Sequence, residues 1–332
     1  MSDTAVNVVV SSRVRLARNY FDLPFLNQNR PENARLCIER AQAALCGAEE
    51  SYDLYLMRDL PDVERLKLVE KHLISRDLVE RAETGAALIR QDRRVSVMIN
   101  EEDHLRIQAI GSGLDLEAAA NVAFGVEGRL EAVCTFSFDP QLGYLTSCPT
   151  NTGTGMRASV MLHLPALTEN GAMSRISTNL SKLGLVIRGT YGEGSNVIGA
   201  MYQLSNQITL GLSEKEAVEN LQNITMQLIS EERKTRASLS KNINVQDKVG
   251  RSAGVLKNAR LLSCDEYMKL ISNVRFGIAE KLLSGITLED IHTLTVAVQP
   301  ATMAAAHGSN LSAGQRDILR ADEVRKALKA LQ

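Results

Sequence analysis

Apolar and polar residues alternate along several short stretches in the first two thirds of the chain, which is the pattern of half-buried strands. Strands are therefore expected in VNVVVSSRVRLARN (residues 6–19), YDLYLM (52–57), RRVSVMIN (93–100), HLRIQAI (104–110), LVIRGTYGEG (185–194) and YQLSNQITLG (202–211). Two shorter runs, AVCTFSF (132–138) and LGYLTS (142–147), flank a DPQ turn and predict a hairpin.

Other segments have helical periodicity. They are RPENARLCIERAQAAL (30–45), PDVERLKLVEKHLI (61–74), LDLEAAANVAFGVEGRL (114–130), RASVMLHLPAL (157–167) and MSRISTNLSKLG (173–184). From Leu212 to the end nearly everything is predicted to be helical, starting with a capping box in which Glu216 follows Ser213 by three residues.

The expected strands mostly follow one another without a regular strand–helix–strand alternation. This order favours an α+β fold with a large, mostly antiparallel sheet flanked by helices over a doubly wound parallel sheet. We expect a first domain over residues 1–245 and a small all-α domain over residues 251–332.

The composition is that of an ordinary globular protein: 332 residues, 44% hydrophobic and 23% charged. With 38 basic and 39 acidic residues the formal net charge is −1, which argues against bulk binding to nucleic acid or to a membrane surface. The sequence shows no signal-peptide pattern and no apolar run of membrane-spanning length. Five irregularly spaced cysteines without a CxxC pair argue against zinc and thioredoxin-type chemistry. Reduced thiols and a cytoplasmic location are expected.

The stretch NEEDHLRI, residues 100–107, crowds unusual chemistry into a few positions. It holds Glu101, Glu102, Asp103 and His104, followed by Arg106. It is neither an HExxH zinc motif nor a calcium-binding loop, because the required spacing is missing from both. Taken alone, such a cluster is as readily a charged turn as a site.

Several arginines lie beside turns or at the ends of expected strands: Arg13, Arg15, Arg106, Arg157 and Arg188. Arg13 and Arg15 have strand spacing and should project from one face. The GTGMRAS segment lacks the GxxxxGK[ST] pattern of a phosphate-binding loop, so other groups would have to hold phosphates. Each arginine alone is an ordinary surface residue, but five beside four loops favour a polyphosphate site, because forked guanidinium groups match phosphate oxygens.

Four motifs in this order resemble those of the phosphagen (guanidino) kinases: SSRVRLARN, NEEDHLR, CPTNTGTGMRAS and RGTYGEG. The resemblance runs from about Val8 to Gly211. The chain is more similar still to the bacterial protein arginine kinases, because it begins almost at SSRVR and carries RDILRA (Arg316–Ala321) near its end.

The resemblance implies transfer of the γ-phosphoryl group of ATP to a guanidinium nitrogen. It implies that Glu102 orients and deprotonates the guanidinium, that Glu193 supplies a second carboxylate and that Cys148 tunes reactivity. Nucleotide binding would fall to His72 and to the five arginines named above. Mg²⁺ is expected to arrive with ATP, without a dedicated protein cage and with Glu101 or Asp103 helping through water. His104 is expected to hold its loop.

The same resemblance gives the RDILRA segment a role. As residues alone, Asp317 and Arg320 would make a weak surface pair at i, i+3 spacing. In protein arginine kinases this segment is a second, allosteric phosphoarginine site, here Arg316, Asp317 and Arg320. The resemblance also implies protein substrates with exposed arginines, a homodimer or larger assembly, a possible activator subunit, and a role in stress response and in marking proteins for Clp degradation.

Two alternatives stay open: a kinase of free arginine that lacks the usual N-terminal domain, and an inactive phosphoarginine-binding regulatory subunit. The presence of Glu102, Glu193 and Cys148 argues against the second, since an inactive relative has no need of these groups. The sequence also departs from the family at Arg76, where proline is usual, and Met161 stands where creatine kinases have histidine, which argues against a creatine kinase.

Overall fold

The computed structural model describes residues 7–26, 31–47, 50–189, 197–308 and 311–332. Its main feature is an eight-stranded sheet with the order β2-β3-β4-β5-β1-β8-β10-β9. All neighbouring strands in it are antiparallel. The strands are β1 (Val9–Arg18), β2 (Tyr52–Leu56), β3 (Ala86–Arg90), β4 (Val95–Ile99), β5 (Leu105–Ser112), β8 (Met156–His163), β9 (Leu185–Gly189) and β10 (Met201–Asn206). The predicted large antiparallel sheet is confirmed.

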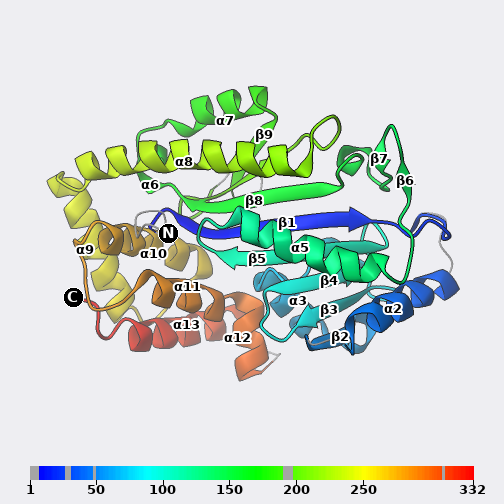
Figure 1. Ribbon diagram of the computed structural model, residues 1–332. Coiled ribbons are helices and arrows are strands. Elements are labelled where there is room, and N and C mark those ends of the chain that lie inside the picture. The colour runs from blue at the N-terminus through cyan, green and yellow to red at the C-terminus, as the bar shows by residue number, and fades with distance from the viewer. Residues whose placement is uncertain (1–6, 27–30, 48–49, 190–196, 309–310) are drawn as a thin grey trace.

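Strand β1 runs through the middle of the sheet, between β5 and β8 (Figure 1). Its side chains alternate between the two faces, as in any strand. Val14 and Leu16 are fully buried on one face, while Arg13 and Arg15 project from the other. The sheet therefore has one apolar face and one face that carries charge at its centre.

Helices α2 (Pro31–Leu45), α5 (Leu116–Glu131) and α8 (Glu214–Leu239) cover the apolar face. Figure 1 shows α5 and α8 lying across the sheet on the same side. The predicted capping box at the start of α8 is present, with the Glu216 carboxylate accepting from the Ser213 amide at 2.9 Å. Helices α6 (Pro165–Glu169) and α7 (Met173–Lys182) connect β8 to β9.

The opposite face of the sheet has a smaller cover. Helices α3 (Asp62–Glu70) and α4 (Arg76–Glu80) pack there against β3 and β4, in a second apolar cluster that includes Leu68, Leu78 and Met98. Met98 is the cross-strand partner of Arg106, so this cover lies directly beside the charged centre of the same face.

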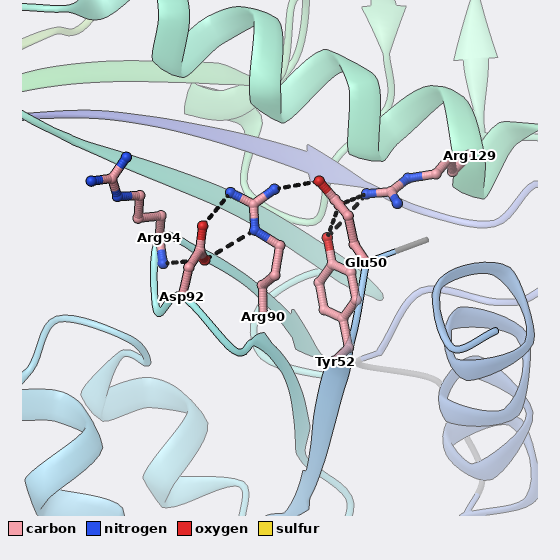
Figure 2. Close-up of polar contacts among 6 residues, drawn as sticks. All are labelled: Glu50, Tyr52, Arg90, Asp92, Arg94 and Arg129. Atoms are coloured by element: carbon pink, nitrogen blue, oxygen red, sulfur yellow. Dashed lines mark hydrogen bonds and ion pairs between the residues drawn. The ribbon is translucent and has the colours of Figure 1, made fainter. Parts of the chain in front are cut away.

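A surface network ties helix α5 to the edge of the sheet (Figure 2). The Glu50 carboxylate accepts from Arg90 of β3 at 2.8 Å and from Arg129 of α5 at 2.7 Å. Asp92 accepts from the far side of the Arg90 guanidinium at 2.8 Å, and the Tyr52 hydroxyl accepts from Arg129 at 3.0 Å. These contacts fix the outer strands against α5, away from the charged centre of the sheet.

The last part of the chain forms a separate helical unit, which we call the C-terminal unit (residues 243–332). It consists of α9 (Ile243–Asn258), α10 (Cys264–Ala279), α11 (Leu288–Ala297), α12 (Pro300–His307) and α13 (Ala313–Ala327), around an apolar core of its own. It packs at one end of the sheet, where the C-terminus of the chain also lies (Figure 1). Helix α9 runs unbroken through residues 246–250, the residues that lie between the two domains expected from the sequence. Within the described residues, no helix has both the length and the apolar content needed to cross a bilayer.

Three details of the sequence prediction were wrong. Residues 157–163, expected to be helical, form strand β8, and only the following Pro165–Glu169 is helical. Strand β3 was not predicted, although AALIR forms it in full. The predicted hairpin exists but is much shorter, since β6 (Phe138–Asp139) and β7 (Gly143–Tyr144) have two residues each.

Candidate functional site

The register of the sheet gathers the five candidate arginines on one face. Arg15 of β1 lies opposite Arg157 of β8, and Arg106 of β5 lies opposite Ala17, two residues along β1 on the same face. Gln203 of β10 connects the remaining two arginines on this face. Arg188 of β9 is its cross-strand partner, and Arg13 of β1 donates to its side chain at 2.6 Å. Four separate sequence motifs therefore meet at one place.

This group of arginines is poorly compensated by negative charge. Burial, and then the positive charges of Arg106 and Arg157, lowers the pKa of Arg13 to about 10. Burial and the neighbouring arginines lower the pKa of Arg15 well below its ordinary value. The Nε atoms of Arg15 and Arg157 are shielded from solvent and have no hydrogen-bond partner in the described part of the chain. Donors left in this condition are costly, and an anion with several oxygens would satisfy them.

In the described part of the chain, one ion pair joins the arginines to the acidic stretch. Arg106 donates to Glu101, whose side chain is fully buried. The second Glu101 oxygen accepts the amide of Glu102 at 3.1 Å. Glu101 thus fixes both the direction of Arg106 and the turn on which Glu102 stands.

Asp103 and His104 are anchored largely by the segment that directly follows β1 in the sequence. Asp103 accepts from the Asn19 side chain at 2.7 Å and from the Ser147 amide at 2.6 Å. The His104 ring accepts the Tyr20 amide at 3.1 Å and contacts the Pro24 carbonyl at 3.0 Å. His104 therefore holds the loop, as predicted, and Asp103 is also engaged in a structural role.

Among the three carboxylates of the stretch, Glu102 is the one that stays partly exposed. Its carboxylate accepts from the Asn151 side chain at 3.4 Å. Burial, followed by the charges of Asp103 and Glu101, raises the pKa of Glu102 above that of an ordinary glutamate, while Arg106 and a hydrogen bond from Cys148 act in the opposite direction. A carboxylate with a raised pKa is suited to accept a proton.

Cys148 begins the loop that lies beside Glu102. Its sulfur is 3.0 Å from the Thr150 hydroxyl, and the side chain is partly exposed. The loop is held from behind by Thr209, whose hydroxyl donates to the carbonyls of Thr150 at 3.0 Å and Thr152 at 2.7 Å. At Gly153, with φ +114°, a Cβ atom would lie 2.1 Å from the Thr209 carbonyl oxygen, so this close approach requires glycine.

His72 follows helix α3 at the border of the arginine group. Its backbone has φ +58°, and its carbonyl accepts the Gln108 side chain at 2.8 Å. Burial and then the charge of Arg13 lower the pKa of His72 to about 4, so the ring is neutral at physiological pH. Its proximity to Arg13 puts His72 at the edge of the candidate site. Glu193, the second predicted carboxylate, lies outside the described residues.

The RDILRA segment lies on α13, in the C-terminal unit. Arg320 is 1% exposed and donates to the carbonyls of Val298 at 3.0 Å and Leu262 at 2.9 Å, and to Asp317 at 2.6 Å. Arg316 is partly exposed and donates to the Leu311 carbonyl at 2.9 Å. Arg316 also lines a cleft of about 640 Å³ between α3 and α12. The two arginines thus have different environments, and Arg316 is the more accessible of them.

Sequence reasoning missed the polar residues that position the site. Asn19, Asn151 and Gln108 hold Asp103, Glu102 and the His72 carbonyl. Asn19 and Asn151 do lie within the motifs SSRVRLARN and CPTN, so their place beside the candidate arginines and Cys148 was the available signal.

The match to known sequence families covers most of the chain. Residues 36–235 match the family described as ATP:guanido phosphotransferase, C-terminal catalytic domain. Residues 242–332 match the family described as protein-arginine kinase McsB C-terminal domain. The similarity thus extends over both the sheet and the C-terminal unit.

Individual relatives agree with these matches. A protein-arginine kinase from Caldanaerobacter subterraneus subsp. tengcongensis is 46% identical over 324 residues, which is 96% of each chain. One from Desulforamulus reducens is 43% identical over 98% of this chain and 93% of its own. The class of protein to which this fold belongs is therefore the ATP:guanido phosphotransferases. Within that class, the chain belongs to the protein-arginine kinase family.

Solved structures agree on the fold. The substrate-free duplicated taurocyamine kinase from Schistosoma mansoni is similar with a TM-score of 0.60 and 30% identity, over 70% of this chain and 35% of that one. A lombricine kinase is similar with a TM-score of 0.61 and 25% identity, over 70% and 68% of the two chains. The architecture is thus that of the phosphagen kinase catalytic domain, as the sequence predicted.

Proposed function

We propose that this chain transfers the γ-phosphoryl group of ATP to the guanidinium group of arginine side chains in proteins. The observation that carries the proposal is the poorly compensated group of arginines on one sheet face, directly beside the turn that bears Glu102. The group of arginines suits a polyphosphate. The turn that bears Glu102 suits a cationic group that must lose a proton.

The arginine group is the donor side of this reaction. Arg13, Arg15, Arg106, Arg157 and Arg188 hold the phosphates, with His72 at the border of the same group. Their positive charge offsets the charge that develops as the bond from the γ-phosphorus to the bridging oxygen breaks. The unpartnered Nε atoms of Arg15 and Arg157 support this role, because phosphate oxygens would satisfy both donors.

Glu102 is the acceptor side. A protonated guanidinium is a poor nucleophile, so one of its nitrogens must give up a proton as the new nitrogen–phosphorus bond forms. Glu102 accepts that proton and orients the guanidinium, Glu193 supplies a second carboxylate, and Cys148 contacts the same guanidinium. The raised pKa of Glu102 supports its role as the base.

Mg²⁺ is part of this proposal. The described residues contain no group of three or more His, Cys, Asp or Glu side chains that could hold a metal ion. Glu101 and Asp103 are already engaged by Arg106, Asn19 and the Ser147 amide. The residues present thus fit an ion that is carried mainly by the phosphates, where it would neutralise phosphate charge.

The proposal includes the division of the chain and its partners. We assign residues 1–245 to catalysis and residues 251–332 to dimerisation and regulation. Arg316, with Asp317 and Arg320 behind it, forms a site for phosphoarginine. Support comes from the match of residues 242–332 to the C-terminal domain of protein-arginine kinases. An activator subunit, a cytoplasmic location and a role in marking stress-damaged proteins for Clp degradation complete the proposal.

A side-by-side assay tests the activity. The purified chain is incubated with Mg·ATP and either free L-arginine or an unfolded, arginine-rich protein, and acid-labile phosphoarginine is measured by mass spectrometry. Label on the protein alone is the expected result. Label on free arginine would instead identify a kinase of small guanidino compounds, and label on neither, with phosphoarginine binding retained, would identify a regulatory subunit.

A further inference from the structure

A carboxylate of the catalytic part caps a helix of the C-terminal unit. Glu70, the last residue of α3, accepts from the amides of Ala301 and Thr302 at 2.7 Å each and from the Thr302 hydroxyl at 2.8 Å. These three hydrogen bonds lie where α3 and α12 make the most extensive helix–helix contact between the two units in the described residues.

Helix α12 lacks a cap of its own. Its N-cap residue, Gln299, makes no capping hydrogen bond, and the following Pro300 has no amide to donate. Ala301 and Thr302 are therefore the first amides of α12 that need an acceptor. Glu70 supplies it, and its charge is further favoured by the positive end of the helix dipole. The Glu70 side chain thus ties the first turn of α12 to the end of α3.

The same end of α3 is connected to the arginine group. His72 stands two residues after Glu70, in a left-handed backbone conformation that costs free energy for a residue with a side chain. Its carbonyl accepts from Gln108 at 2.8 Å, and Gln108 is the direct cross-strand partner of Arg15. The His72 ring, for its part, is close enough to Arg13 to have its pKa lowered by that charge.

We propose that Glu70 is a positioning residue for the nucleotide site. By holding the first turn of α12, it fixes the end of α3, and through His72 and Gln108 it sets the arginine group in the geometry that binds phosphates. The inference rests on the proposed function only in taking this group as the nucleotide site. It makes nucleotide affinity depend on the docking of the C-terminal unit, and linkage requires that nucleotide in turn strengthens that docking.

The first test compares Glu70→Ala and Glu70→Gln with the unchanged protein. We expect the dissociation constant for Mg·ADP and the KM for ATP to rise by roughly threefold to thirtyfold in Glu70→Ala, while kcat changes much less. In Glu70→Gln both constants should lie between those of Glu70→Ala and those of the unchanged protein, because an amide oxygen still accepts hydrogen bonds but carries no charge. If Glu70→Ala lowers the melting temperature yet leaves the dissociation constant within about twofold, the residue only fastens the units together and the inference is wrong.

Glu169→Ala is the matched control. It removes another carboxylate that bridges the two units, since Glu169 of α6 pairs with Lys248 of α9 at 2.9 Å. That pair is exposed and has no connection to His72, so nucleotide affinity should stay within about twofold of the original value. An equal loss of affinity in Glu169→Ala and Glu70→Ala would contradict a specific role for Glu70.

The second test uses hydrogen exchange and needs no phosphoryl transfer. Mg·ADP should slow amide exchange in a peptide covering residues 300–307 of the unchanged protein, and this protection should disappear in Glu70→Ala. Exchange that nucleotide does not alter in the unchanged protein would overturn the inference. A chain that binds Mg·ADP and shows the protection, but forms no phosphoarginine, would refute the proposed activity while supporting the role of Glu70. Failure to bind nucleotide at all would refute both.

Discussion

Arg15 and Arg157 face each other directly across the β1–β8 pair, although like charges in that relation repel. Neither has a carboxylate partner among the interactions found in the described residues, and the Nε atom of each is left without a hydrogen bond. The protein thus keeps an arrangement that costs stability. An anion bound between the two guanidinium groups would recover this cost, as expected of a binding site and not of a structural ion-pair network.

Replacing Arg15 by methionine should therefore have opposite effects on folding and on binding. The free energy of unfolding of the apo protein should rise by on the order of 1 kcal/mol, because a poorly compensated charge is replaced by an apolar side chain. The affinity for Mg·ATP should fall at least about tenfold, since a charge-assisted phosphate contact is lost. Denaturant unfolding and calorimetric titration measure the two quantities, with the exposed Arg35→Met as control. A destabilised Arg15→Met protein with unchanged affinity would show that Arg15 is structural.

Glu102→Ala should stop phosphoryl transfer while nucleotide still binds. Loss of the proposed base should lower kcat by about a hundredfold or more, whereas the arginine group proposed to hold the phosphates is untouched. Quantified phosphoarginine and the dissociation constant for Mg·ADP report the two effects. Glu117→Ala, which removes a carboxylate from the first turn of α5, is the control. Turnover in Glu102→Ala within about tenfold of the original would assign the proton to another group.

The rate of transfer should depend on the protonation of Glu102. Because burial, Asp103 and Glu101 raise the pKa of Glu102, the carboxylate takes up a proton at a higher pH than an ordinary glutamate does. A protonated carboxyl cannot act as a base, so kcat/KM should fall as pH decreases through that raised pKa. The profile of kcat/KM against pH, measured where circular dichroism shows an intact fold, checks this. An acidic limb that persists unchanged in Glu102→Asp would belong to another group.

Alkylation should identify Cys148 as the functional thiol. Burial raises the pKa of Cys37 to about 12 and that of Cys134 to about 11, and it also raises the pKa of Cys46 and of Cys264. These four should react slowly with iodoacetamide at neutral pH. Modification of Cys148 and the variant Cys148→Ala should each lower transfer about tenfold or more, and Cys148→Ala should resist further inactivation. Peptide mapping by mass spectrometry that finds another cysteine modified first would contradict this assignment.

Arg316→Ala and Arg320→Ala should behave differently, although the two residues are one helical turn apart. Arg320 is buried and donates to two carbonyls and to Asp317, so its removal should destabilise the C-terminal unit by about 3 kcal/mol or more. Arg316→Ala should leave the melting temperature nearly unchanged and weaken binding of phosphoarginine. Thermal unfolding and titration with phosphoarginine separate these effects. Equal destabilisation by both variants would leave Arg316 without a separate binding role.

The sequence allowed the charged face to be predicted because β1 alternates cleanly between Val14, Leu16 and the two arginines. It failed at β8, where residues 158–163 are buried without alternation and several, such as Met161 and Leu162, are good helix formers. A strand buried on both faces carries no period of two, so its pattern is easily taken for a helix. The order of strands in the structure was needed to correct the prediction that this segment is helical.

Within the site, the motifs predicted which residues gather but not what each of them contacts. That Glu101 pairs with Arg106 could be suspected from their closeness in sequence. That Asn19 holds Asp103, or that Arg320 is buried against the Leu262 and Val298 carbonyls, depends on segments brought together only by folding. Long-range hydrogen bonds of this kind leave no periodic trace in a sequence.

The central place of β1 has a consequence for synthesis on the ribosome. Arg13 and Ser159 touch in the folded protein but are 146 residues apart along the chain. The middle strand therefore leaves the ribosome long before the strand that must lie on one side of it. During that interval Arg13 and Arg15 lack the neighbouring strands that form their site. If this face binds nucleotide as proposed, the nascent chain cannot do so until β8, which ends at His163 of the 332 residues, has been translated.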